Sequence, residues 1–192
     1  MRVCTMQEKQ QALISAAIQL ISQEGVGVAT AKIARTAGVS NGTLFNYFAT
    51  KQILFETVYL HIKTKMAQDI LPVADKQTSL QHFLAAVWMS FSAWCVHNPV
   101  ELAALNTLKS SQLLGNAVTD EGERIWASIF SRLEQGMSDK VIVTAPVSLV
   151  TTSIEGLVHS VASYASYHNL SEPKFEKLTK RSFDIFWKGI TL

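Results

Sequence analysis

The amino-acid sequence predicts an all-α protein with a small N-terminal domain and a larger helical C-terminal domain. Three observations lead to this fold class. Apolar residues recur at three- and four-residue spacing along most of the chain, as one buried face of a helix requires. Segments with this spacing begin at capping residues and end at glycine or proline. The longest strand-like run is only 141–144, and the sequence contains no internal repeat.

Length and composition allow both domains. The chain has 192 residues, 48% of them hydrophobic. No apolar run reaches the ~18–20 residues that span a bilayer, because Ser90 and Ser92 interrupt the longest candidate, 83–96. The N-terminus lacks the apolar core of a signal peptide, and the two cysteines, Cys4 and Cys95, lie far apart. We therefore expect a soluble cytoplasmic protein with reduced thiols, no membrane partner, no metal site and no cofactor.

The segment 30–51 predicts two short helices joined by a tight turn. Thr30 is expected to cap the first helix, Gly38 to end it in the left-handed conformation, and Ser40 to cap the second. The apolar face of the first helix consists of Ile33, Ala34 and Ala37. Two helices joined in this way form a helix-turn-helix, whose second helix lies in the major groove of DNA. An ordinary two-helix corner shares the pattern and stays open as an alternative.

The outward side chains of the second helix suit DNA. Asn41 can form a paired hydrogen bond to adenine, Thr43 can contact a base or a thymine methyl, and Gly42 allows close approach of the backbone. Tyr47 and Lys51 suit phosphates, which set orientation and affinity without reading sequence. The candidate DNA contacts are Thr30, Lys32, Ser40, Asn41, Gly42, Thr43, Asn46, Tyr47 and Lys51.

Residues around this motif complete a known pattern. They are Ile14, Ala16, Ala17, Gly25, Thr30, Ile33, Ala34, 37–40, 42–45, Tyr47, Phe48 and Lys51. With them, the segment 11–54 resembles the DNA-binding domain of TetR-family transcriptional regulators. Phe45 departs from the usual Tyr and lacks its hydroxyl, and Ala31 replaces a residue that is often polar. The resemblance implies a three-helix DNA-binding domain at 1–50 and a ligand-binding, dimerising body at 51–192.

Charge is distributed unevenly along the chain. Residues 1–65 contain seven basic and three acidic side chains, a net charge of +4. The whole chain carries +2, so the remainder carries −2. A positive N-terminal head on a mildly acidic body suits DNA binding through one end, above all when two heads act together.

Beyond residue 50 the whole chain is predicted to be helical. Start signals are Thr78 with Gln81 as a capping box, Asn98 followed by Pro99, and Asp120. Pro72 is expected to end the first of these helices. The expected ranges are 51–71, 78–95, 99–114, 120–136, 146–168 and 173–190.

The last two predicted helices form a candidate dimer interface. A stripe of small residues follows one face of the first. Gly156 within it costs about 1 kcal/mol relative to Ala, and a close backbone contact with another helix is a reason for a glycine there. The interface candidates are Ser153, Gly156, Ser160, Ser163, Tyr167, Phe183, Phe186 and Trp187. The resemblance implies the same homodimer, built as a four-helix bundle. A helix hairpin within one protomer is the alternative. A two-fold dimer would read a palindrome.

The middle helices are rich in large aromatic side chains. The candidate ligand-binding residues are Trp88, Phe91, Trp94, Trp126 and Tyr164. An ordinary core explains such a stripe as well. The resemblance implies a small-molecule effector whose binding changes the separation of the two DNA-binding heads. Since the sequence shows no buried basic cluster, we expect a largely apolar effector.

Catalysis is poorly supported. The five histidines form no i, i+4 metal-binding pair, and no glycine-rich phosphate loop follows a strand. We therefore predict that the protein is no enzyme. We expect a sequence-specific transcriptional regulator, most simply a repressor released from a palindromic operator by its ligand. A small-molecule-binding dimer with vestigial DNA binding is the alternative.

Overall fold

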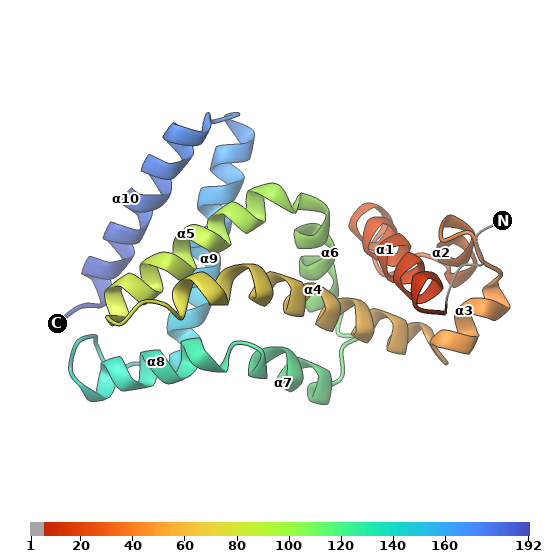
Figure 1. Ribbon diagram of the computed structural model, residues 1–192, viewed down its shortest axis with the longest axis horizontal. Coiled ribbons are helices and arrows are strands. Elements are labelled where there is room, and N and C mark those ends of the chain that lie inside the picture. Colours follow the sequence, from red (N-terminus) through yellow and green to blue (C-terminus); the bar gives the residue numbers. More distant parts are fainter. Residues whose placement is uncertain (1–5) are drawn as a thin grey trace. The chain divides into compact units, whose positions relative to one another are not determined.

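The computed structural model describes residues 6–192, which form ten helices (Figure 1). The predicted all-α fold class is confirmed. Strand pairing in this part of the chain is limited to an isolated antiparallel bridge between Ile142 and Thr191. No helix of these residues is long and apolar enough to cross a membrane. Cys4, one of the two cysteines, lies outside the described residues.

Spatial contacts divide the chain into two compact units. Unit 1 combines the chain up to Thr64 with Pro99–Glu123, and unit 2 combines Lys65–Asn98 with Arg124–Leu192. The helices are α1 (Met6–Glu24), α2 (Thr30–Thr36), α3 (Asn41–Tyr47), α4 (Lys51–Ala74), α5 (Leu80–His97), α6 (Pro99–Ser110), α7 (Asn116–Arg124), α8 (Ala127–Ser138), α9 (Val147–Tyr167) and α10 (Glu172–Ile190). The predicted functional division into 1–50 and 51–192 stays a prediction.

The core of unit 1 brings together segments far apart in the sequence. Helix α1 packs against α2 and also against α6, and α2 packs against α3. Their apolar positions follow helical spacing, so that each helix buries one face. Fully buried side chains are Leu13, Ala17 and Ile21 of α1, Ile33 and Ala34 of α2, Leu44 of α3, Leu54, Phe55, Val58 and Ile62 of α4, and Ala104 and Leu108 of α6. Helix α6 therefore belongs to the core of the N-terminal unit.

Helix α7 and the loop before it contact the first half of α4. The Gly115 N–H donates to the Glu56 carboxylate at 3.1 Å, and Gln52 donates to the same oxygen at 3.0 Å. Gly122 lies directly against the ring of Tyr59, where an added Cβ would come within 2.6 Å of a ring carbon. Only glycine allows α7 to approach α4 this closely.

Helix α5 is the centre of unit 2 and packs against α8, α9 and α10. The Trp88 ring lies 5.0 Å from the Phe186 ring and 5.8 Å from the Phe183 ring, and its indole N–H donates to Ser182 Oγ at 2.9 Å. Such edge and offset aromatic contacts add to the burial energy of the rings. Trp88 of α5 thus contacts α10 in two ways, through its ring against Phe183 and Phe186 and through its indole N–H to Ser182.

Several predicted boundaries are wrong. Thr30 is the first residue of α2 and not its cap, since Ala29 holds the cap position. Helix α4 continues through Pro72 to Ala74, because a proline this close to the end removes a single backbone hydrogen bond. Ser79, and not Thr78, caps α5, where its hydroxyl accepts a bond from the His82 N–H at 3.2 Å.

Two boundaries in the middle of the chain also differ from the prediction. Helix α6 ends at Ser110 and not at Leu114, and Gln112 takes a positive φ of 56°. The expected helix 120–136 is two helices, because Trp126 has non-helical backbone angles between α7 and α8. The last two predicted helices are confirmed as α9 and α10.

We predict that Gly122→Ala lowers the free energy of unfolding by about 1–3 kcal/mol, because the new methyl group overpacks the buried Tyr59 ring. Urea unfolding followed by circular dichroism measures this change. Gly189→Ala in α10 is the matched control, since its Cβ would meet no atom within 4 Å. Equal stability of the two variants would contradict the close packing of α7 on α4.

Candidate nucleic-acid interface

The turn between α2 and α3 is fixed by backbone geometry. Gly38 has a φ of +72°, a left-handed conformation that side chains other than glycine rarely adopt. The Val39 N–H then donates to the Ala34 carbonyl at 2.9 Å, which satisfies an acceptor at the end of α2. The predicted turn at Gly38 is confirmed. It fixes the direction in which α3 leaves.

Ser40 caps α3, as predicted. Its hydroxyl oxygen accepts a hydrogen bond from the Thr43 N–H at 3.1 Å and lies 2.9 Å from the Thr43 hydroxyl. The Ser40 carbonyl accepts the Leu44 N–H at 3.1 Å. Capping of this kind stabilises a helix by about 1 kcal/mol. The hydroxyls of Ser40 and Thr43 therefore lie at the N-terminal end of α3 and also stabilise it.

Helix α3 has one buried and one open face. Leu44 is fully buried, and Phe48 just after the helix is 2% exposed. Asn41, Gly42 and Asn46 are exposed. The structure thus brings the short polar candidates together on the outer face of one helix, while the apolar residues attach the helix to unit 1. Apart from Phe45, whose ring is also exposed, the outward groups are uncharged and polar.

Three other candidates flank this face, and each is half-buried. Tyr47 lies with its ring centre 6.4 Å from that of Phe48. The Lys51 ammonium lies 5.3 Å from the ring centre of Phe55, where the ring face attracts a cation. Thr30 begins α2. Thr50 caps α4, since its hydroxyl accepts the Ile53 N–H at 3.1 Å.

Lys32 has a partner that the sequence analysis missed. Its ammonium lies 2.6 Å from the carboxylate of Glu24, the last residue of α1. The C-terminus of a helix carries partial negative charge, which repels a carboxylate there, and a nearby cation offsets this repulsion. That unfavourable position was the available signal in the sequence.

The predicted ligand residues occupy different parts of unit 2. Trp88, Phe91, Trp94 and Trp126 are buried, and Phe91 packs 5.6 Å from the ring of His159 on α9. Tyr164 is 53% exposed on the outer side of α9 and does not join the buried group. Within residues 6–192, the buried Trp94 indole N–H and the Ser92 hydroxyl have no hydrogen-bond partner. Buried polar groups without a partner are uncommon.

Cys95 is an inert thiol in this setting. Burial, and secondarily the negative charge of Glu155, raise the pKa of Cys95 to about 12. A thiol with this pKa stays protonated near neutral pH and is a poor nucleophile. In the described part of the chain no three His, Cys, Asp or Glu side chains are grouped to hold a metal ion.

The dimer candidates fall into two sets. Those of α9 lie on its outer face and are exposed, together with Leu149, Leu157 and Tyr164; they are Ser153, Gly156, Ser160, Ser163 and Tyr167. Those of α10 point inward: Phe183 and Phe186 are buried against Trp88, and Trp187 is half-buried and stacked on Phe183 at 6.1 Å. Their helical positions oppose the solvent face, so they form the protomer's own core.

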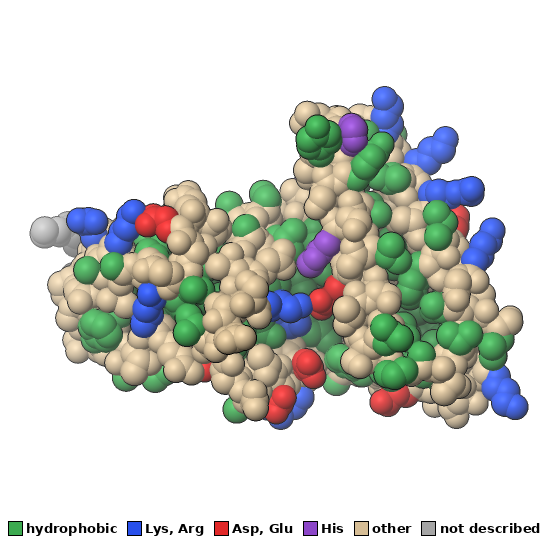
Figure 2. Space-filling view, turned by 180° about the vertical axis from the view of Figure 1, so that it is seen from behind, with side chains coloured by type: hydrophobic (Ala, Val, Ile, Leu, Met, Phe, Trp, Pro, Cys, Tyr) green, Lys and Arg blue, Asp and Glu red, His purple; other side chains and the backbone are tan. Residues whose placement is uncertain are grey.

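The outer faces of the last two helices differ in chemistry. The stripe on α9 contains no charged residue. The outer face of α10 is strongly charged, and Figure 2 shows its basic side chains along the edge of unit 2. These are Lys174, Lys177, Lys180, Arg181 and Lys188. An exposed, uncharged helix face with Leu and Tyr is the one suited to a partner.

The sequence and the fold of this chain are similar to those of a known protein family. The family model of bacterial regulatory proteins of the TetR family matches residues 13–58, from α1 into α4. A solved TetR-family transcription regulator from Shewanella sp. PV-4 is 27% identical, with a TM-score of 0.86 over 96% of this chain and 98% of that chain. These matches support a TetR-family transcriptional regulator, with residues 13–58 matching the family's own model. The recognition made from the sequence is confirmed.

Two further TetR-like proteins are informative. The HTH-type transcriptional regulator BetI of Escherichia coli is 30% identical over 128 residues, which are 56% of this chain and 65% of BetI. The chain thus spans less than two thirds of that relative. The regulator FadR of Bacillus subtilis, solved in complex with stearoyl-CoA, is 19% identical with a TM-score of 0.74, covering 94% of this chain and 98% of that one. This last likeness concerns the fold.

Proposed function

We propose that the protein is a sequence-specific DNA-binding transcriptional regulator, a cytoplasmic repressor without enzymatic activity. One observation carries the proposal: a capped helix, α3, offers a short polar face to solvent while Leu44 and Phe48 anchor its other face. A fixed glycine turn precedes it, as in DNA-reading helix-turn-helix motifs. The match to the family model and the similarity to BetI support the same function.

The proposed DNA contacts divide into two kinds. Asn41, Thr43 and Asn46 can exchange hydrogen bonds with base edges, because amides and hydroxyls match the donors and acceptors of the major groove. Tyr47 and Lys51 can contact phosphates, which fix the register of the helix. Thr30, Lys32, Ser40 and Gly42 lie beside these groups in the chain and complete the proposed site.

We propose a homodimer that uses the outer face of α9. The exposed side chains there are small or apolar. A Cβ added at Gly156 would have no atom of the protomer within 4 Å. A partner helix could therefore approach this position closely. Phe183 and Phe186 are left out of the contact, because they are buried in the protomer. Two heads related by a two-fold axis would read a palindrome.

We propose that unit 2 binds a small, largely apolar effector. Trp94 is the best-supported contact, since its buried indole N–H lacks a partner in the described chain and could donate to one ligand oxygen. The likeness in fold to FadR, solved with stearoyl-CoA, supports a ligand with a long apolar part. Release from DNA requires that ligand and DNA favour different arrangements, with a coupling of about 1–3 kcal/mol.

Selection from a random duplex pool at near-physiological salt tests DNA reading. We expect one palindrome, and Asn41→Ala is expected to bind it about 5- to 150-fold more weakly, the loss of a paired contact of ~1–3 kcal/mol. Asn116→Ala, an exposed asparagine at the start of α7, is the control and should bind as the wild type does. Recovery of only salt-sensitive background would favour a ligand-binding dimer with a vestigial head.

The dimer is tested by placing a charge on the uncharged face. Ser160→Glu is expected to give monomers in analytical ultracentrifugation at micromolar concentration, because two carboxylates would be buried against each other. Ser166→Glu makes the same change on another side of α9, where the residue is also exposed. A dimeric Ser160→Glu variant would rule out this face as the interface.

The effector site is tested with fatty-acid methyl esters of graded chain length. We expect the best-fitting ester to raise the unfolding temperature of the wild type and to raise that of Trp94→Phe less, because Phe keeps the ring and loses the N–H donor. Trp187→Phe, at a half-buried position on α10, is the control. Equal shifts in all three proteins would exclude Trp94 as a donor to these ligands.

A further inference from the structure

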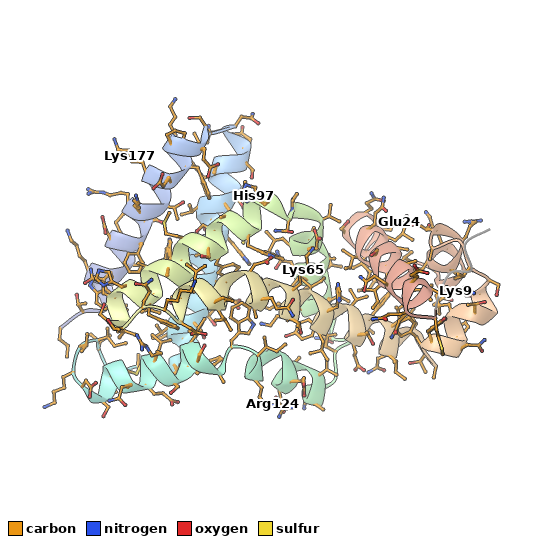
Figure 3. All side chains as sticks on the ribbon, viewed as in Figure 1. Lys9, Glu24, Lys65, His97, Arg124 and Lys177 are labelled. Atoms are coloured by element: carbon orange, nitrogen blue, oxygen red, sulfur yellow. The ribbon has the colours of Figure 1, made fainter. Side chains whose placement is uncertain are left out.

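A carboxylate is held against a cation of the proposed DNA-binding surface. The Glu24 carboxylate at the end of α1 lies 2.6 Å from the ammonium of Lys32, in the first turn of α2. Both side chains remain accessible, with relative exposures of 37% and 43%. Glu24 is labelled in Figure 3, on the N-terminal unit. The pair therefore lies at the surface, where solvent and ions reach it.

The stability of α1 does not explain a glutamate at this position. A helix C-terminus carries partial negative charge and favours Lys, Arg or His. The last turn of α1 has no basic residue, and Gly25 follows at once with a φ of +76°. The Lys32 contact compensates this unfavourable placement. An exposed ion pair contributes little to folding, so the pair's main effect is on the charge of the surface.

The pair changes what a phosphate would meet on α2. Helices α2 and α3 contain no Asp or Glu of their own, so Glu24 brings a negative charge to α2 that its own sequence lacks. A lysine near a phosphate adds affinity by releasing counterions from DNA. A lysine already neutralised by a carboxylate releases fewer, and the carboxylate itself is repelled by the phosphates.

From this contact we infer that Glu24 is an electrostatic brake on DNA binding, which acts through Lys32. The inference rests on the proposed function and adds a regulating residue to the same site. Allosteric effectors typically change the affinity for a second ligand by about 5- to 150-fold. If phosphate contacts contribute less to the affinity for DNA, an effector with a coupling of that size is sufficient to release the protein from its operator. The smaller phosphate contribution also leaves more of the affinity to the uncharged base-reading side chains of α3.

Glu24→Gln tests the brake, because it removes the charge and keeps the shape. We expect about two- to fivefold tighter operator binding at low salt. The slope of log affinity against log salt should become steeper by up to ~0.9, the share of one added phosphate contact. Fluorescence anisotropy over a salt series gives both quantities. In a Lys32→Ala background Glu24→Gln should gain less than in the wild type, because no lysine is left to be released and only the repulsion of the carboxylate is removed.

The chain offers a matched control for net charge. Lys180 and Glu176 of α10 form an exposed pair of the same 2.6 Å length in unit 2. Glu176→Gln changes the net charge equally and should leave affinity and salt slope unchanged. Unchanged or weaker binding by Glu24→Gln, or an equal gain in Glu176→Gln, overturns the brake while DNA reading stands. If the wild-type protein selects no sequence from the random duplex pool, the proposed function is wrong and the inference about Glu24 is wrong with it.

Discussion

The DNA-reading surface depends on one backbone constraint, the left-handed conformation of Gly38. With that φ the chain changes direction within a few residues, so that Ser40 can cap the next helix directly. Leu44 and Phe48 then turn inward, and the polar side chains between them are left outside. A residue with a Cβ at position 38 would find space but would strain the backbone. The orientation of every proposed base contact thus depends on the conformation of a residue that is not itself one of the proposed contacts.

Charge is used sparingly on this surface. The base-reading candidates are neutral, Lys51 lies over an aromatic ring, and Lys32 is paired with a carboxylate. A head of this kind gains less from phosphates, so that base contacts, and in the proposed dimer the joint action of two heads, supply more of the affinity. The uncharged face of α9 and the weakly basic head are therefore complementary features. Both features fit the proposed dimer, in which two heads act together on one DNA site.

The sequence correctly predicted the features that depend on residues close together in the chain. Gly38, Ser40 and the apolar periods of α9 and α10 gave correct elements, because a turn conformation, a cap and a helix face are set by neighbouring residues. The failures concern tertiary contacts. Nothing near Gly122 in sequence announces the ring of Tyr59, and Phe183 and Phe186 were assigned to a partner because periodicity shows an apolar face without showing what covers it. Lys32 was identified as a candidate contact, whereas its pairing with Glu24 required the fold.

The packing of α6 on α1 has a consequence for synthesis. Residues of α6 emerge from the ribosome long after α1–α3, so a nascent chain holding only the helix-turn-helix leaves apolar surface of α1 uncovered. Exposed surface of this kind is what chaperones and proteases recognise. Premature termination before residue 99 would thus yield a fragment marked for removal and not a free DNA-binding head competing for operators. The discontinuous core thus ties a stable DNA-binding head to synthesis of the chain through α6.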